Sequence, residues 1–462
     1  TLTAGTLTLG GANTYTGATT INGGALVQTG SLSNLTNVVM LGNSVWDLQA
    51  AQVIESLLMS GGNSIINSSG VASSLVVNGS ADINNIATYG SQTYNGTVTL
   101  RGGNVVGGNA PGTGPYMSGG TLNPVLLSSN GGNITFNGTI NAGSQSALYK
   151  RSLTIEAGAG SVTFNQTIGT RGTLAGIADG NIYEFTVKAQ NIYINADIIT
   201  NEIQTYLGHV WIGDNHNNGY TRTLLSEDPS VVFGDYQVAP GGVIYLGAID
   251  DATLNTHTLN VLAVSNWSGS TDPVITFGNP IGANQALYSI VVVTGIQDIT
   301  SGKNFADIPT NASQYVGTIN IMGNVTTAST QTYTSNSFTL GGSTSITNNN
   351  IVFTTNHADI TFNIGLTPPA FALNNGTTTV TFTLGGSNVN TAAVTAMNAV
   401  GIRPQGLFDL KSINFGGSLH SSFNKVMADV ASNNPVTADV EVGQFEQLSC
   451  DPSSSNNGTC DK

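Results

Sequence analysis

The side chains best able to do chemistry gather in one short stretch. It holds imidazole and carboxylate groups at the following positions: His209, Asp214, His216, Glu227 and Asp228. Such groups could ligate a transition metal or serve as a general acid and base. Alternation along a strand places His209 and Trp211 on one face, whereas Asp214 and His216 fall in an expected turn. Convergence on one metal or substrate is therefore not implied, and we expect surface and turn groups rather than a catalytic or metal site.

The rest of the chain offers no stronger catalytic constellation. Hydrolysis of a glycosidic bond needs two carboxylates roughly 5–10 Å apart across the cleaved bond, and acidic residues are too sparse here to predict such a pair. The sequence also lacks the calcium-binding G-G-x-G-x-D repeat, G-x-S-x-G, the phosphate-binding P-loop and H-E-x-x-H. We therefore predict neither an enzyme nor a bound cofactor.

Both cysteines of the chain, Cys450 and Cys460, lie in one short loop rich in Pro, Ser, Asn and Gly. The turn propensity of this loop allows the two Cα atoms to come within the roughly 4.4–6.8 Å that a disulfide requires. We predict that they form a disulfide, which implies an oxidising compartment; two reduced cysteines in a frayed tail are the alternative. A ring this small removes only about 3 kcal/mol of chain entropy, so its expected role is local.

Asparagine-linked glycosylation is the other modification that the sequence allows. Sequons of the form N-x-S/T occur at the following residues: Asn34, Asn67, Asn78, Asn95, Asn133, Asn137, Asn165, Asn266, Asn311, Asn324, Asn375 and Asn457. Chance supplies many such sites in a chain so rich in Asn, Thr and Ser. We expect sugars on a minority at most, with the other asparagines in turns or in hydrogen-bonded ladders.

The composition of the chain is unusual and limits the kind of fold that can position these residues. Charged residues make up 8% of the 462 residues, against about 25% in an ordinary domain, and the formal net charge is −14. That sign argues against nucleic acid or an anionic membrane surface as a partner. A hydrophobic fraction of 39% can supply a large core, and no apolar run is long enough to predict a spanning helix. Because Thr1 begins in mid-pattern, we expect a piece of a longer protein.

Short alternating runs separated by Gly-Gly, Asn-Gly and Ser-Gly predict strands almost everywhere before residue 390. One recurring motif is an apolar residue, a spacer and Phe: Ile134–Phe136, Val162–Phe164, Val231–Phe233, Ile275–Phe277, Ile360–Phe362 and Val380–Phe382. Another motif surrounds a tyrosine, at Tyr15, Tyr94 and Tyr333. Residues two apart in a strand share a face, so each Phe motif should point two large apolar groups inward and build an interior aromatic column.

These degenerate repeats predict an all-β fold, a right-handed parallel β-helix, over residues 1–390. Repeats about 20–30 residues apart, each too small to bury its own face, are typical of a solenoid that stacks them into one core. Antiparallel sandwiches are the rival, but they do not predict the same local motifs along the whole length. Register between repeats would also place Thr, Ser and Asn side chains in hydrogen-bonded ladders, and a low charge would avoid repulsion within them.

The pattern changes after residue 390, and we expect a divergent C-terminal cap over residues 391–449. Ser421–Ala431 places apolar residues at a helical spacing, which predicts a short helix. Such a segment could cap the solenoid against end-to-end stacking or dock a partner. Residues 450–462 then form the disulfide-closed terminal loop.

Several motifs resemble those of large bacterial exoproteins. Gly11–Ala25 resembles the strand repeat of autotransporter passenger domains. Three further segments look like repeat units of filamentous-haemagglutinin-like exoproteins: Gly90–Leu100, Gly213–Ser230 and Asp250–Leu259. The loop between Cys450 and Cys460 is similar to the disulfide-closed C-terminus by which some two-partner-secreted high-molecular-weight adhesins stay tethered to their secretion pore.

The resemblance implies a non-enzymatic, rod-like adhesin exported from a Gram-negative bacterium and held at its surface by an outer-membrane secretion pore. No N-terminal secretion domain is recognisable, so we expect the distal, C-terminal part of the exoprotein. No fused outer-membrane domain is recognisable either, which disfavours a classical autotransporter. Asp250, Asp251 and His257 recur as a repeat motif in that family, which implies a structural role. The expected partners are the pore, a host or bacterial surface receptor or glycan, and further copies of the chain. A polysaccharide-degrading β-helix enzyme and a subunit of a self-assembling extracellular filament are the competing functions.

Overall fold

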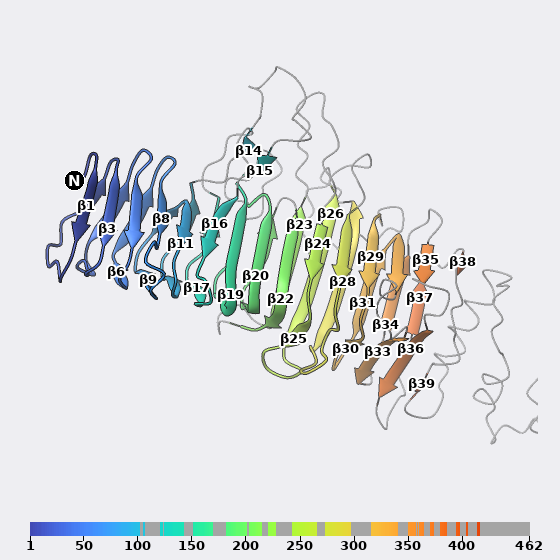
Figure 1. The fold of residues 1–462 in the computed structure, drawn as a ribbon. Coiled ribbons are helices and arrows are strands. Elements are labelled where there is room, and N and C mark those ends of the chain that lie inside the picture. The colour runs from blue at the N-terminus through green and yellow to red at the C-terminus, as the bar shows by residue number, and fades with distance from the viewer. Residues whose placement is uncertain are drawn as a thin grey trace, which may run out of the picture. The chain divides into compact units, whose positions relative to one another are not determined.

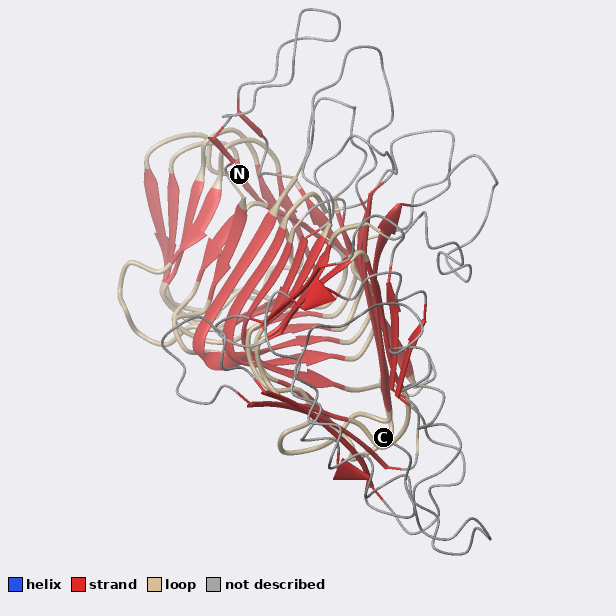
Figure 2. Cartoon of the chain, turned by 90° about the vertical axis from the view of Figure 1, so that its right-hand side faces the viewer, coloured by secondary structure: helices blue, strands red, loops and turns tan. Residues whose placement is uncertain are grey.

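Every regular element in the described part of the chain is a strand, which confirms the all-β prediction (Figure 2). The computed structural model describes the following residues: 1–101, 105–106, 121–122, 124–142, 151–169, 182–200, 203–214, 220–227, 243–265, 273–296, 316–340, 350–356, 358, 360–364, 370–373, 379–385, 394–397, 403–404 and 414–415. Within these residues no helix is present that could cross a membrane. The chain divides into two compact units, described in turn below: Thr1–Tyr245 with Ser265–Thr271, and Leu246–Val264 with Asp272–Lys462.

The first unit is built from strands that pair in parallel with strands further along the chain (Figure 1, blue to green). One stack runs through β1 (Thr6–Leu9), β3 (Ala25–Gln28), β5 (Val45–Leu48), β8 (Ser64–Ile66), β11 (Asn85–Ala87), β16 (Val125–Ser128), β19 (Leu153–Phe164), β20 (Phe185–Ile194) and β22 (Gln204–Ile212). Its register places Thr6 opposite Ala25, Ala25 opposite Val45 and Val45 opposite Ser64. The steps between β1 and β8 are about 20 residues, and those between β11 and β20 are longer. The repeat spacing read from the sequence is therefore the pairing period of these first strands, whereas later steps of the stack, such as Ile86 to Leu127, are longer than predicted.

Further parallel stacks complete this unit. One contains β6 (Gln52–Ile54), β9 (Leu75–Val77), β12 (Gln92–Tyr94) and β17 (Ile134–Phe136), and joins the C-terminal part of β19. Another contains β2 (Thr19–Ile21), β4 (Asn37–Met40), β7 (Ser56–Met59), β10 (Ala81–Ile83), β13 (Val98–Leu100) and β18 (Ile140–Asn141). β21 (Ile198–Thr200) pairs in parallel with β23 (Thr221–Glu227), whereas β14 (Val105–Val106) and β15 (Thr121–Leu122) are antiparallel. β24 (Val243–Leu246) closes this part of the sequence.

The second unit repeats the parallel arrangement. One stack contains β27 (Val274–Phe277), β29 (Thr318–Ile321), β32 (Ser337–Leu340), β35 (Ala370–Leu373) and β38 (Arg403–Pro404). Another contains β26 (Thr258–Ser265), β28 (Ser289–Ile296), β31 (Gln331–Ser335), β34 (Ile360–Ile364) and β37 (Val394–Met397). A third contains β30 (Val325–Thr326), β33 (Asn350–Asn356), β36 (Thr379–Gly385) and β39 (Asn414–Phe415). β25 (Ile249–Asp251) lies at the start of the unit.

Parallel pairing in the second unit continues into the region expected to form a cap. β37, β38 and β39 all lie beyond residue 390, and each pairs in parallel with a strand of the preceding repeat. The helix expected at Ser421–Ala431 and the loop at 450–462 lie outside the described residues. The domain boundaries at 390 and 449 therefore remain predictions.

The core of the first unit contains the interior aromatic column that the Phe motifs predict. Ile134 and Phe136 are fully buried while Thr135 between them faces outward, because side chains alternate along a strand. Register then brings rings of successive strands together: the centroids of Tyr94 and Phe136 are 5.2 Å apart, and those of Phe136 and Phe164 are 5.5 Å apart. The column continues to Phe185 and Tyr206 with centroid distances of 5.6 and 6.1 Å.

A buried glutamine two residues before a buried tyrosine bonds to the hydroxyl of that tyrosine at Tyr94, Tyr206 and Tyr333. The Tyr94 hydroxyl donates to Gln92 Oε1 over 2.9 Å, and Gln92 Nε2 donates to Thr88 Oγ1 over 3.1 Å and to the backbone carbonyl of Ser128 over 2.8 Å. Burial raises the pKa of the Tyr94 hydroxyl, so it stays a neutral donor. The amide group thus satisfies polar groups on two successive repeats, which an apolar side chain would leave buried without partners.

The same arrangement recurs: it is present at two of the three predicted tyrosine motifs, Tyr94 and Tyr333, and also at Tyr206, which was not predicted. Tyr206 donates to Gln204 Oε1 over 2.8 Å and Tyr333 donates to Gln331 Oε1 over 3.1 Å. Tyr15 differs, because its side chain is exposed and its hydroxyl lies 2.9 Å from Thr19 Oγ1. The informative motif is therefore Thr-x-x-x-Gln-Thr-Tyr, in which the glutamine donates to the threonine four residues earlier, and the tyrosine alone is not sufficient.

Candidate functional site

His209 lies on the outer face of β22, where it stacks on Trp211. Their ring centroids are 4.4 Å apart with an interplanar angle of 10°, as expected for residues two apart in a strand. Gly208 has a φ of +155°, and a Cβ there would collide with the backbone carbonyl of Ala189 on β20. This close approach accompanies a register shift that sets His209 opposite Asn191. His209 is therefore part of an aromatic surface on a sheet.

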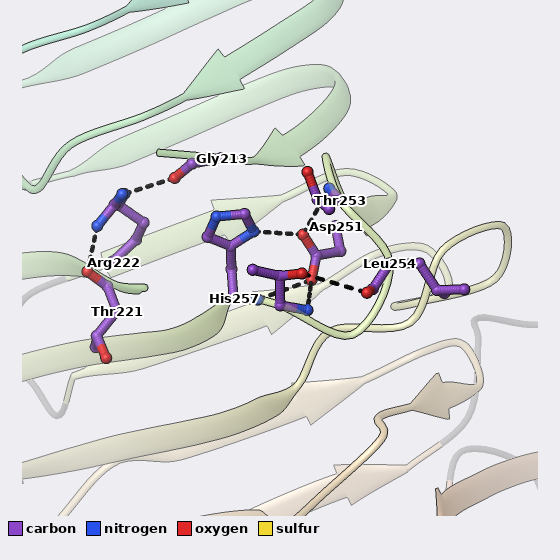
Figure 3. Close-up of polar contacts among 8 residues, drawn as sticks. Gly213, Thr221, Arg222, Asp251, Thr253, Leu254 and His257 are labelled. Carbon is purple, nitrogen blue, oxygen red and sulfur yellow. Dashed lines mark hydrogen bonds and ion pairs between the residues drawn. The ribbon is translucent and has the colours of Figure 1, made fainter. Parts of the chain in front are cut away.

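Asp214 contributes to the surroundings of Arg222, a side chain that the sequence analysis did not single out. Arg222 is fully buried, and its Nε donates to the carbonyl of Gly213 over 2.6 Å while Nη1 donates to the carbonyl of Thr221 over 2.7 Å (Figure 3). Burial lowers the pKa of the guanidinium, an effect opposed by attraction to Asp197 and Asp214. Arg222 thus links the start of β23 to the backbone just after the end of β22.

Asp197 is the second carboxylate near this guanidinium. Desolvation raises the pKa of Asp197, against the hydrogen bond that it accepts from the backbone N–H of Thr223 over 2.8 Å and the attraction of Arg222. One sequence signal could have revealed the arrangement: Arg222 shares its strand face with Leu224, which is fully buried. A charged residue on an apolar strand face has to find carbonyl and carboxylate partners inside the protein.

The remaining residues of the predicted cluster give no convergent site in the described part. Glu227 ends β23, and His216 and Asp228 lie outside the described residues. Among the residues that the structure describes, no group of three or more His, Cys, Asp or Glu side chains could hold a metal ion.

Asp251 organises the turn that follows β25. Its carboxylate is fully buried and accepts backbone N–H groups of Thr253, Thr256 and His257 over 2.9, 2.8 and 2.8 Å. His257 is also buried, and its Nδ1 lies 2.5 Å from Asp251 Oδ1, with the imidazole ring pointing toward the carboxylate (Figure 3). At the tip of the turn Leu254 is 59% exposed. One carboxylate therefore holds both ends of a surface loop.

Asp250 holds a different loop segment of the second unit, at Asn284 and Gln285, by accepting hydrogen bonds. It is buried, and it accepts from the backbone N–H groups of Asn284 and Gln285 over 2.9 and 3.0 Å and from Asn284 Nδ2 over 2.7 Å. Because consecutive residues in a strand point to opposite sides, the Asp250–Asp251 pair can serve two loops at once. The geometry of the motif is that of a loop organiser.

The described sequon asparagines divide into different structural classes. A ladder runs along the first unit, in which each Nδ2 donates to the Oδ1 of the preceding member over 3.3, 2.8, 2.7 and 2.7 Å: Asn78, Asn95, Asn137, Asn165 and Asn195. All of these except Asn195 are sequons. Asn67 is buried and donates to Val71 and Ser73. By contrast Asn34, Asn133 and Asn324 are exposed, and the other predicted sites lie outside the described residues: Asn266, Asn311, Asn375 and Asn457.

Removing one ladder member tests whether the ladder stabilises the stack. Asn137→Ala breaks the bonds to Asn95 and to Asn165, and we expect local opening of β17 to become easier by about 1 kcal/mol. Asn34→Ala, on an exposed turn, is the control and should change stability by less than about 0.5 kcal/mol. Hydrogen exchange of the backbone amides measures both; equal effects would show that the ladder contributes nothing.

An uncharged outer face lies beside the ladder on β12, β17, β19, β20 and β22. Register aligns its central row across these strands: Thr93, Thr135, Thr163, Tyr193 and Trp211. A second row precedes it by two residues on each strand: Ser91, Asn133, Ser161, Asn191 and His209. The side chains of the central row are partly exposed, and none of them is Asp, Glu, Lys or Arg.

Comparison with known families links the N-terminal repeat to exported proteins. The family model described as the passenger-associated-transport-repeat matches residues 4–27. The match runs from residue 4 into β3, which is one step of the parallel pairing, and it contains the whole segment Gly11–Ala25 noted above for its resemblance to autotransporter passengers. Neither the curated proteins nor the solved structures gave a match. This repeat indicates a passenger-type, secreted and surface-exposed chain.

Proposed function

We propose that the chain is the non-enzymatic extracellular rod of a large secreted bacterial adhesin, folded as a right-handed parallel β-helix. The observation that carries this proposal is the coincidence of the passenger repeat at residues 4–27 with one step of the parallel pairing that recurs through the first unit. Stacked repeats of this kind offer an extended surface over which attachment can be distributed.

In this proposal the rod leaves the cell by two-partner secretion and remains on the Gram-negative surface. Its partners are the outer-membrane secretion pore and a host or bacterial surface receptor. Attachment is favoured over catalysis because the buried adjacent carboxylates of the second unit are used otherwise: Asp250 and Asp251 each accept several hydrogen bonds from loop backbone. A carboxylate whose lone pairs are so engaged is poorly placed to exchange protons with a substrate.

The first test compares binding with turnover. Purified protein is expected to bind cells or surfaces while releasing no reducing ends from uronate-rich or neutral polysaccharides. Depolymerisation that is abolished by His216→Ala or Asp214→Ala would establish the enzyme instead. Electron micrographs of the native particle showing polymers rather than single rods would favour the filament subunit.

The terminal ring gives a second test, because we propose that it tethers the rod to the pore. A loop already closed by a disulfide loses less entropy on docking than a flexible tail. Cys450→Ser and Cys460→Ser should therefore each release the protein into the medium with its circular dichroism unchanged, as measured by immunoblots of cell and medium fractions. Ser454→Ala, within the same loop, is the control and should stay on cells. Retention of either cysteine variant would refute the tether.

A further inference from the structure

The uncharged outer face of β12, β17, β19, β20 and β22 ends in a cluster of aromatic rings. Tyr193 and Trp211 lie opposite each other in register, with ring centroids 6.4 Å apart and an interplanar angle of 17°. His209 stacks on Trp211 at 4.4 Å. The neighbouring Val210 and Ile212 point inward and are fully buried, whereas Tyr193, His209 and Trp211 are half-buried. Part of the ring surface of the cluster is therefore accessible to a ligand.

Hydrogen-bonding groups of neutral side chains surround these rings. Trp211 Nε1 donates to Asn191 Oδ1 over 3.1 Å, which fixes the orientation of the indole. Thr163 continues the row of the rings, and the asparagine ladder runs along one side of it. β19 and β20 also carry an ion pair between Lys188 and Glu156, at 2.8 Å. Register shifts separate this pair from the rows of the outer face, and its two charges compensate each other.

We propose that this face binds a neutral glycan chain, with Tyr193, His209 and Trp211 as the aromatic platform. The apolar C–H face of a pyranose ring packs against aromatic surface, and its hydroxyls both donate to and accept from amides and threonine hydroxyls. Strands in a sheet repeat about every 4.8 Å, a distance close to the length of one pyranose unit, so successive sugars meet equivalent side chains. The chain would lie across the strands, along the Thr93 to Trp211 row.

The absence of charge selects this ligand over the alternatives. An acidic polysaccharide or a nucleic acid needs cations, and the central row offers none in a protein of net charge −14. A cationic peptide would need carboxylates on the face, and the rows supply amides, hydroxyls and rings instead. The inference rests on the proposed function, since it names the class of receptor that such an adhesin would engage.

The experiment titrates the full chain with cellohexaose, laminarihexaose and maltohexaose by calorimetry, with hexagalacturonate as the charged comparison. We expect at least one neutral hexasaccharide to bind, and Trp211→Ala to weaken it about tenfold or more. Trp211→Phe should keep most of the affinity. Leu207→Ala is the matched control, because Leu207 is 43% exposed on the same strand but outside the aromatic cluster; its affinity should not change.

Each contrary result has a defined meaning. Failure of all neutral probes, preference for hexagalacturonate, or full binding by Trp211→Ala would overturn the inference. A change of sedimentation coefficient in Trp211→Ala would assign the face to contact between copies, which also overturns it. Cell attachment measured in parallel separates the two proposals: attachment without glycan binding refutes only this inference, and glycan binding without attachment refutes only the adhesin.

Discussion

Phe136→Ala is expected to cost the first unit about 3–5 kcal/mol of local stability, the typical effect of deleting a buried aromatic side chain. Phe136 is fully buried, and its ring is stacked between those of Tyr94 and Phe164 at 5.2 and 5.5 Å. Truncation would leave a cavity and remove two stacking contacts at once. Since strands above and below fix the backbone, the column has little freedom to collapse into the gap.

The matched control is Thr135→Ala, one residue away on the outward face of the same strand. It keeps the column and should change stability by less than about 0.5 kcal/mol. Stacked-repeat proteins can open locally, so hydrogen exchange of amides in β12, β17 and β19 is a better measure than a single melting temperature. Similar exchange in both variants would mean that the column does not hold the repeats together.

The Phe motifs were predictable because they need only local information. Alternation within β17 fixes which side of the strand Phe136 occupies, and composition fixes that this side is the core. The tyrosine motifs were predicted less well, since the local sequence around Tyr15 is similar to that around Tyr94 and yet Tyr15 is exposed. What separates them is the glutamine two residues earlier, whose partner carbonyl belongs to Ser128 on a distant segment.

Arg222 and the Asp250–Asp251 pair mark the limit of the sequence argument. Scarce charged residues attract attention as candidate catalysts, but here most of their hydrogen-bond partners are backbone groups, whose positions the local sequence does not specify. Arg222 donates to the carbonyls of Gly213 and Thr221, and Asp251 accepts from the N–H groups of its own loop. Resemblance to a repeat motif predicted the structural role of the pair, whereas only the structure explains how the two carboxylates hold the loops.

Asp251→Ala is the second substitution with a large expected effect. It removes the acceptor of three backbone N–H groups and the partner of His257, and leaves buried donors unsatisfied. The expected cost is about 3–5 kcal/mol, as for removal of one member of a buried pair. Loss should be confined to the turn between β25 and β26, which would become sensitive to limited proteolysis near the exposed Leu254. Thr253→Ala is the control, because Thr253 is exposed and the hydrogen bonds of its backbone N–H and carbonyl are kept by the substitution.

His257→Ala tests whether the carboxylate of Asp251 has a structural or a catalytic role. If Asp251 serves the loop, the backbone bonds to Thr253, Thr256 and His257 survive loss of the imidazole, so His257→Ala should expose the turn less than Asp251→Ala does. If the imidazole and carboxylate instead form a reactive pair, the two substitutions should leave the loop intact and abolish the same activity. Protection of the Thr256 and His257 amides, measured by hydrogen exchange in both variants, decides between these outcomes. Unchanged protection in Asp251→Ala would contradict the loop role, because within the described part of the chain the N–H of Thr256 has only the carbonyl of Thr253, at 3.2 Å, as an acceptor besides Asp251.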